Sequence, residues 1–101
     1  MSLKKISVEE FHQLQIRDPH TQMIDVREPV EYRNGAIPNI KNLPLSDINS
    51  WLHQMDKHKP VYLVCRSGNR ATQAAEKLEA KGCDVCVVEG GLDAWIAEQL
   101  P

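Results

Sequence analysis

The chain has 101 residues, a length that suits one domain with a modest core. Its formal charge of −2, with 42% hydrophobic and 26% charged residues, argues against a partner such as nucleic acid or an anionic membrane. No apolar run approaches the roughly 20 residues that a membrane-spanning helix needs, and the polar start Met1–Lys5 lacks the apolar core of a signal peptide. These features predict a single cytoplasmic domain over residues 1–101.

The first half of the chain alternates helical and extended segments. Ser7 and Glu10 form a capping box, with Ile6 and Phe11 as a hydrophobic staple, and predict a helix over residues 8–15. A strand over 22–26, a helical turn over 28–34 and a short strand over 40–42 follow. Ser46 is expected to cap the next helix, which ends before Pro60. That helix is indicated by an apolar stripe of Ile48, Trp51, Leu52 and Met55.

The second half of the chain has clearer signals of secondary structure. Residues 61–64 and 85–88 are short apolar runs typical of buried strands. Between them, a helix over 71–81 ends at Gly82, and a closing helix follows the last strand. These helices are indicated by two apolar sets, Ala71, Ala74, Ala75 and Leu78 in the first and Leu92, Trp95 and Ile96 in the second. Apolar strands separated by helices predict a small three-layer α/β domain with a central, mostly parallel sheet and helices on both faces.

The six residues Cys65–Arg70, with sequence CRSGNR, carry the strongest chemical signal. They follow a predicted strand and lead into a predicted helix, so loop amides and the helix N-terminus can stabilise negative charge. Arg66 and Arg70 add two cations beside the thiol. This arrangement favours a reactive thiolate at Cys65 over an inert buried cysteine.

The other cysteines and the histidines carry weaker signals. Cys83 and Cys86 form a C-x-x-C pattern, but it opens a strand rather than a helix, where positions three apart face opposite sides. An odd number of cysteines without a secretion signal indicates reduced thiols. The four histidines show no metal-ligand spacing. We therefore expect neither a metal site nor a cofactor.

Three segments that contain charged residues, cysteine or glycine follow predicted strands. They are residues 25–27, the Cys65–Arg70 loop and the pair Gly90 and Gly91. In a parallel sheet the carboxyl ends of the strands meet at one edge, where functional sites lie. The three segments are therefore expected to form one site.

These motifs together resemble the rhodanese family of sulfurtransferases, over essentially the whole chain. The resemblance rests on residues 24–28 (IDVRE), Glu31-Tyr32, residues 35–38 (GAIP), residues 42–45 (NLPL), the Cys65–Arg70 loop, Gly90-Gly91 and Trp95. The chain departs from the family at Ala36, where histidine is usual, and at Asn39-Ile40, where Gly-Ala is usual. The resemblance implies a small α/β fold and transfer of a sulfane sulfur through a persulfide on Cys65.

This chemistry suits the loop. A small anionic donor such as thiosulfate would give its outer sulfur to Cys65, and a thiol or cyanide would accept it. The amides of Arg66, Ser67, Gly68, Asn69 and Arg70 can point at the anionic terminal sulfur, and the two arginines can hold the donor. Ser67 either donates its hydroxyl to the persulfide or caps the loop. Arg27 either contacts substrate, as the resemblance implies, or forms a structural ion pair that ties the strand to Glu28, Glu31 or a neighbouring loop. Glu31 and Tyr32 are expected to be structural, and Trp95 a core anchor.

Two other functions use the same loop. A persulfide carrier would receive sulfur from one protein partner and pass it to another. A phosphatase or arsenate reductase would use a longer loop, C-x5-R in place of the C-x4-R found here, to surround a tetrahedral oxyanion. The shorter loop favours a single sulfur atom, so sulfur transfer is the preferred prediction.

Overall fold

Five short strands form one sheet in the computed structural model, which describes residues 3–101. In chain order they are β1 (Lys4–Ile6), β2 (Gln22–Asp25), β3 (Lys41–Asn42), β4 (Val61–Val64) and β5 (Val85–Val88). The spatial order is β1-β5-β4-β2-β3, and every neighbouring pair is parallel. The predicted mostly parallel sheet is thus confirmed and is parallel throughout.

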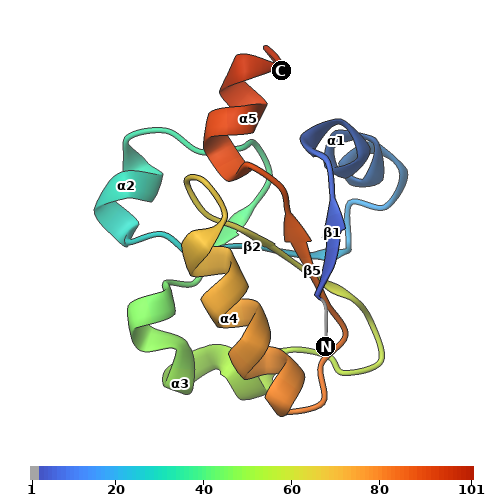
Figure 1. The fold of residues 1–101 in the computed structure, drawn as a ribbon, viewed down its shortest axis with the longest axis vertical. Coiled ribbons are helices and arrows are strands. Elements are labelled where there is room, and N and C mark those ends of the chain that lie inside the picture. Colours follow the sequence, from blue (N-terminus) through green and yellow to red (C-terminus); the bar gives the residue numbers. More distant parts are fainter. Residues whose placement is uncertain (1–2) are drawn as a thin grey trace.

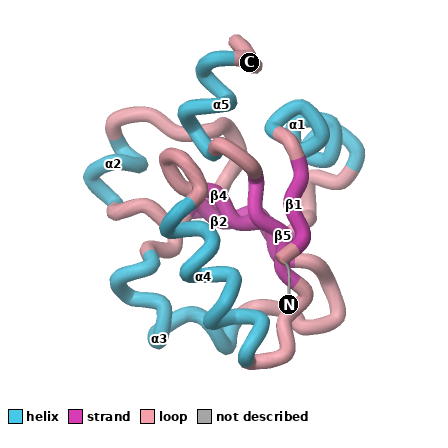
Figure 2. Tube along the Cα trace, in the orientation of Figure 1, coloured by secondary structure: helices cyan, strands magenta, loops and turns pink. Residues whose placement is uncertain are grey.

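Helices cover both faces of the sheet, as Figures 1 and 2 show. They are α1 (Val8–Arg17), α2 (Pro29–Arg33), α3 (Ile48–Trp51), α4 (Asn69–Ala80) and α5 (Gly91–Ala97). The core beside α3 and α4 takes Ile24, Val61, Leu63, Val85 and Val87 from the strands, and the core beside α1 and α5 takes Met23, Val64 and Val88. The predicted three-layer α/β architecture is confirmed. Among the described residues, no helix has the length and apolar character needed to cross a membrane.

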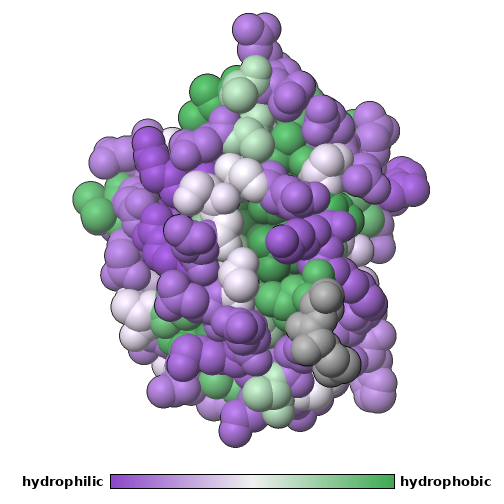
Figure 3. Space-filling view, in the orientation of Figure 1, coloured by the Kyte–Doolittle hydropathy of each residue, from purple (hydrophilic) through white to green (hydrophobic). Residues whose placement is uncertain are grey.

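The surface follows from this layering. Figure 3 shows hydrophilic side chains around the periphery of one face, with hydrophobic surface concentrated in the middle, between the two helix layers. Within residues 3–101, three large hydrophobic side chains are more than half exposed: Ile16, Val30 and Ile96. Of these, Ile96 lies on α5, the helix that follows the last strand.

The first helix forms as the sequence predicts. The Ser7 hydroxyl accepts a hydrogen bond from the backbone N–H of Glu10 at 3.1 Å, and the Glu10 carboxylate accepts one from the Ser7 N–H at 3.3 Å. Phe11 is fully buried in the core beside α5. The helix continues to Arg17, two residues beyond the predicted end.

One strand was missed, and two predictions about local structure were wrong. Strand β1 was not predicted; it is an edge strand that exists through its pairing with β5. The helix expected after Ser46 is instead α3, four residues long and flanked by two 3-10 turns, Leu45–Asp47 and Leu52–Gln54. Ser46 caps nothing; its hydroxyl donates to the Glu28 carboxylate, 2.8 and 3.0 Å from the two oxygens.

The connection from α2 to β3 accommodates the departures from the family pattern. Asn39 adopts φ of 61°, the left-handed conformation that glycine and asparagine tolerate best. Ile40, the next residue, is buried. Asparagine at position 39 therefore suits the left-handed backbone conformation that this turn requires.

Candidate functional site

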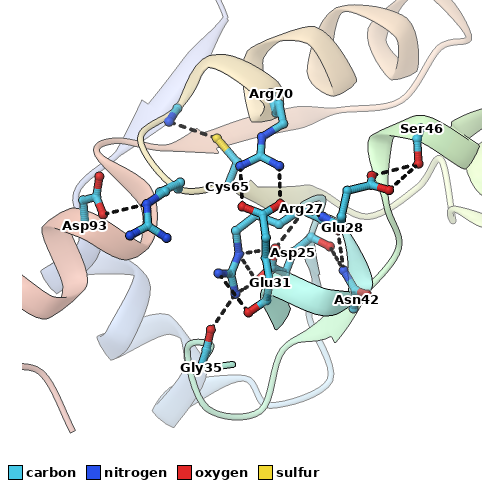
Figure 4. Close-up of polar contacts among 12 residues, drawn as sticks. Asp25, Arg27, Glu28, Glu31, Gly35, Asn42, Ser46, Cys65, Arg70 and Asp93 are labelled. Atoms are coloured by element: carbon cyan, nitrogen blue, oxygen red, sulfur yellow. Dashed lines mark hydrogen bonds and ion pairs between the residues drawn. The ribbon is translucent and has the colours of Figure 1, made fainter. Parts of the chain in front are cut away.

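The reactive loop is attached to the carboxyl end of β4, in the middle of the sheet. Cys65 directly follows β4 and is 1% exposed. The Gly68 backbone N–H donates to the Cys65 sulfur at 2.9 Å (Figure 4). Gly68 adopts φ of 123° and precedes the first residue of α4, which starts two residues earlier than predicted. The loop thus points an amide and the N-terminus of a 12-residue helix at the sulfur, an arrangement that stabilises negative charge there.

The last helix fixes the loop from the other side. The backbone N–H groups of Leu92 and Asp93, at the start of α5, donate to the carbonyls of Cys65 and Arg66 at 2.9 and 3.0 Å. Gly91 makes this approach possible, because a Cβ atom there would lie 2.1 Å from the Cys65 carbonyl oxygen. The predicted meeting of the loop with the Gly90-Gly91 segment is confirmed.

Replacing Gly91 with alanine should therefore move the reactive loop. The new Cβ would collide with backbone, which cannot rotate away, so we expect a loss of about 1–3 kcal/mol in the free energy of unfolding. Urea denaturation measures this loss, and Gly82→Ala is the matched control. Gly82 also has a positive φ, 91°, but a Cβ there meets nothing closer than 3.9 Å. If both variants lose the same free energy of unfolding, the close approach at Gly91 does not contribute to stability.

The two arginines of the loop are both paired with carboxylates. Arg70 makes a bidentate ion pair with Glu31 of α2, at 2.5 and 3.0 Å (Figure 4). The hydrogen bond from Arg70 lowers the pKa of Glu31 to about 2, and Glu31 in turn raises the pKa of Arg70. The Nε atom of Arg66 lies 3.7 Å from the Oδ1 atom of Asp93, and both of these side chains are more than half exposed. Arg70 is thus held in place, whereas Arg66 is only loosely paired.

The Arg27 side chain is buried, and its guanidinium group donates several hydrogen bonds. Its Nε and Nη2 atoms donate to the Asp25 carboxylate at 2.7–3.0 Å, and Nη2 also donates to the Gly35 carbonyl at 2.8 Å. Both side chains of this ion pair are 1% exposed. These contacts match a structural ion pair for Arg27, and the bond to Gly35 reaches a neighbouring loop, but the carboxylate partner is Asp25 rather than the expected Glu28 or Glu31. A substrate contact stays a prediction.

A cleft of about 680 Å³ opens beside the loop. Arg27, Glu31, Gly35 and Arg66 line one part of it, and the apolar side chains of Leu92, Trp95, Ile96 and Leu100 line another. Trp95 is 4% exposed and packs edge-on against His12, so its predicted role as a core anchor is confirmed. The cleft therefore combines charged groups near the loop with an apolar wall from α5 and the residues after it.

The predicted site residues divide between two sides of the loop. Arg66 faces the large cleft, whereas Ser67, Gly68 and Asn69 line a separate hollow of about 210 Å³ with Lys5 and Glu89. Glu31 was expected to be structural, and its ion pair with Arg70 agrees with that expectation. The pairing itself was not predicted, because a contact between residues 39 positions apart leaves no signal in a single sequence.

Comparisons with known proteins agree with this geometry. Residues 7–98 match the profile of the family described as "Rhodanese-like domain". The Bacillus subtilis protein named "Putative sulfurtransferase YtwF" is 34% identical over 101 residues, which covers 100% of this chain and 98% of that protein. The Bacillus subtilis "Putative sulfur carrier protein YrkF" is 31% identical over 93% of this chain and 51% of its own length, so this chain spans about half of it. A crystal structure of a rhodanese-like domain protein from Staphylococcus aureus is 36% identical, has a TM-score of 0.86, and covers 92% of this chain and 91% of its own.

Proposed function

We propose that this chain, which belongs to the rhodanese-like domain family, transfers a sulfane sulfur from thiosulfate or another donor through a persulfide on Cys65. Family membership and the names of the relatives support sulfur transfer in general. The assignment of the Cys65 sulfur as the atom that receives the transferred sulfur rests on its hydrogen bond from the Gly68 N–H.

In the first step, the Cys65 thiolate attacks the outer sulfur of the donor. With thiosulfate, the bond between the two sulfur atoms breaks, sulfite leaves with the electron pair, and Cys65 becomes a persulfide. The Gly68 amide and the N-terminus of α4 stabilise the charge that the cysteine carries before the attack and the persulfide carries after it. The thiolate is the nucleophilic form of cysteine in a transfer of this kind.

In the second step, a thiol or cyanide attacks the outer sulfur of the persulfide. The bond between the Cys65 sulfur and the outer sulfur breaks, and the thiolate of Cys65 is regenerated. Covalent catalysis of this kind divides one difficult transfer into two easier ones. The loop amides stay in place through both steps, because Leu92 and Asp93 hold the carbonyls of Cys65 and Arg66.

A persulfide carrier between protein partners is the second candidate. The apolar wall of the cleft and the half-exposed Ile96 beside the loop favour it. A relative named as a sulfur carrier also supports it. A phosphatase or arsenate reductase remains the least favoured candidate, because the loop is one residue shorter than C-x5-R.

Intact mass spectrometry tests the proposal directly. The protein is incubated with thiosulfate and, separately, with a protein persulfide donor, and then with a reductant. We expect the mass to rise by one sulfur atom and the reductant to reverse the change. Loading from the protein donor alone would favour the carrier. Hydrolysis of p-nitrophenyl phosphate without sulfur loading from any donor would refute sulfur transfer.

A further inference from the structure

We propose that Glu31 determines the sulfur donor, because it neutralises Arg70 and so favours an organic persulfide, whose sulfur atoms carry at most one negative charge, over the thiosulfate dianion. This inference rests on the proposed function and names the substrate class of the same site. Glu31 does not touch the reacting sulfur. It acts through Arg70 and is therefore a positioning residue rather than a catalytic one.

The charges around the loop balance within the described residues. Arg27 faces Asp25, Arg70 faces Glu31, and Arg66 faces Asp93. Each of these three arginines is thus matched by a carboxylate. The paired arginine side chains therefore add little net electrostatic attraction for a dianion such as thiosulfate to that of the Gly68 amide and the N-terminus of α4.

The pair of Arg70 with Glu31 is tighter than the pair of Arg66 with Asp93. Two hydrogen bonds of 2.5 and 3.0 Å join Arg70 to Glu31, and each of these side chains is about one-third exposed. Glu31 also accepts a hydrogen bond from the Glu28 N–H at 3.0 Å, which fixes the carboxylate on α2. Since the pKa of Glu31 is about 2, the pair stays charged over the neutral pH range.

Arg66 is then the loop arginine that can move toward a donor. Its partner, Asp93, lies 3.7 Å away, and the Arg66 side chain is 60% exposed. One mobile positive charge suits the one negative charge that develops on a leaving thiolate, rather than the two on sulfite. The wall formed by Leu92 and Ile96 can pack against the organic part of a persulfide, whereas sulfite offers no apolar group.

The transfer from such a donor is balanced without any further reagent. The Cys65 thiolate attacks the outer sulfur of R–S–SH, and the bond between the two donor sulfurs breaks. The thiolate R–S⁻ leaves with the electron pair, and Cys65 holds the transferred –SH group. No oxidant or reductant takes part.

The test compares the rate of sulfur loading on Cys65 from 2-hydroxyethyl persulfide and from thiosulfate. Wild type should prefer the persulfide. Glu31→Gln retains the size and the acceptor oxygen of the side chain but removes its charge, so the relative rate with thiosulfate should rise about tenfold. Glu28→Gln removes a neighbouring charge on the same segment, one that binds Ser46 rather than Arg70, and should change the ratio by less than about twofold.

Salt dependence supplies a second readout that a merely structural role would not alter. Loading of wild type from thiosulfate should be almost independent of ionic strength, whereas loading of Glu31→Gln should fall as salt rises. An unchanged donor ratio in Glu31→Gln, or an equal change in Glu28→Gln, would refute the role of Glu31. If neither donor loads Cys65 in wild type, the proposed function itself fails. If Glu31→Gln does not fold, a preference for thiosulfate or a steep salt dependence in wild type still overturns the inference.

Discussion

Replacing Cys65 with serine is expected to abolish sulfur loading completely. Cys65 is the cysteine whose sulfur accepts a backbone N–H and lies at the N-terminus of a helix. Burial raises the pKa of Cys86 to about 11 and also raises the pKa of Cys83, so both stay protonated near neutral pH. A protonated thiol is a poor nucleophile, and these two cysteines should take no part in the transfer.

The matched control is the double variant Cys83→Ala, Cys86→Ala. Both side chains are buried, and alanine keeps an apolar group at each position. Intact mass after treatment with a donor should show one added sulfur in the double variant and none in Cys65→Ser. A sulfur adduct that persists in Cys65→Ser would place the transferred atom on another cysteine.

Replacing Arg27 with methionine should strongly destabilise the fold. Methionine keeps much of the apolar length of the side chain but leaves the Asp25 carboxylate buried without its cation and the Gly35 carbonyl without this donor. Removing one partner of a fully buried ion pair typically costs about 3–5 kcal/mol. Urea denaturation should show this loss in the free energy of unfolding.

An exposed ion pair of the same length provides the control. Lys4 and Asp84 are also 2.7 Å apart, but their side chains are 70% and 47% exposed. Lys4→Met should therefore change the stability much less than Arg27→Met. If Arg27→Met is as stable as wild type but loads sulfur slowly from thiosulfate, Arg27 contacts the donor and its structural role is refuted.

The elements that could be predicted from the sequence are those whose signal is local. The capping box at Ser7, the apolar run of β4 and the apolar stripe of α4 each depend on residues within a few positions of one another. The Cys65–Arg70 loop was predicted as the site for the same reason, since the strand end, the loop and the helix start are contiguous.

The elements that were missed depend on contacts between distant segments. Strand β1 contains Lys4 and Lys5, both exposed, so three residues at the edge of the sheet carry no alternation that would reveal them. The segment around α3 has the apolar spacing of a helix, yet Asn49 and Ser50 are weak helix formers and the backbone tightens into 3-10 turns at both ends. The ion pair of Arg70 with Glu31 joins helices α4 and α2, which no local pattern connects.

The strand order has a consequence for synthesis on the ribosome. Strand β5 is the last strand in the chain, but it lies between β1 and β4 in the sheet. Strand β1 therefore has no partner until β5 has been synthesised, because Lys4 pairs with Cys86. The amides that hold the Cys65 and Arg66 carbonyls come still later, at the start of α5. In a nascent chain whose α5 is still inside the ribosome, the loop that carries Cys65 therefore lacks these two hydrogen bonds. The Cys65–Arg70 loop therefore gains these two hydrogen bonds after translation has passed the start of α5.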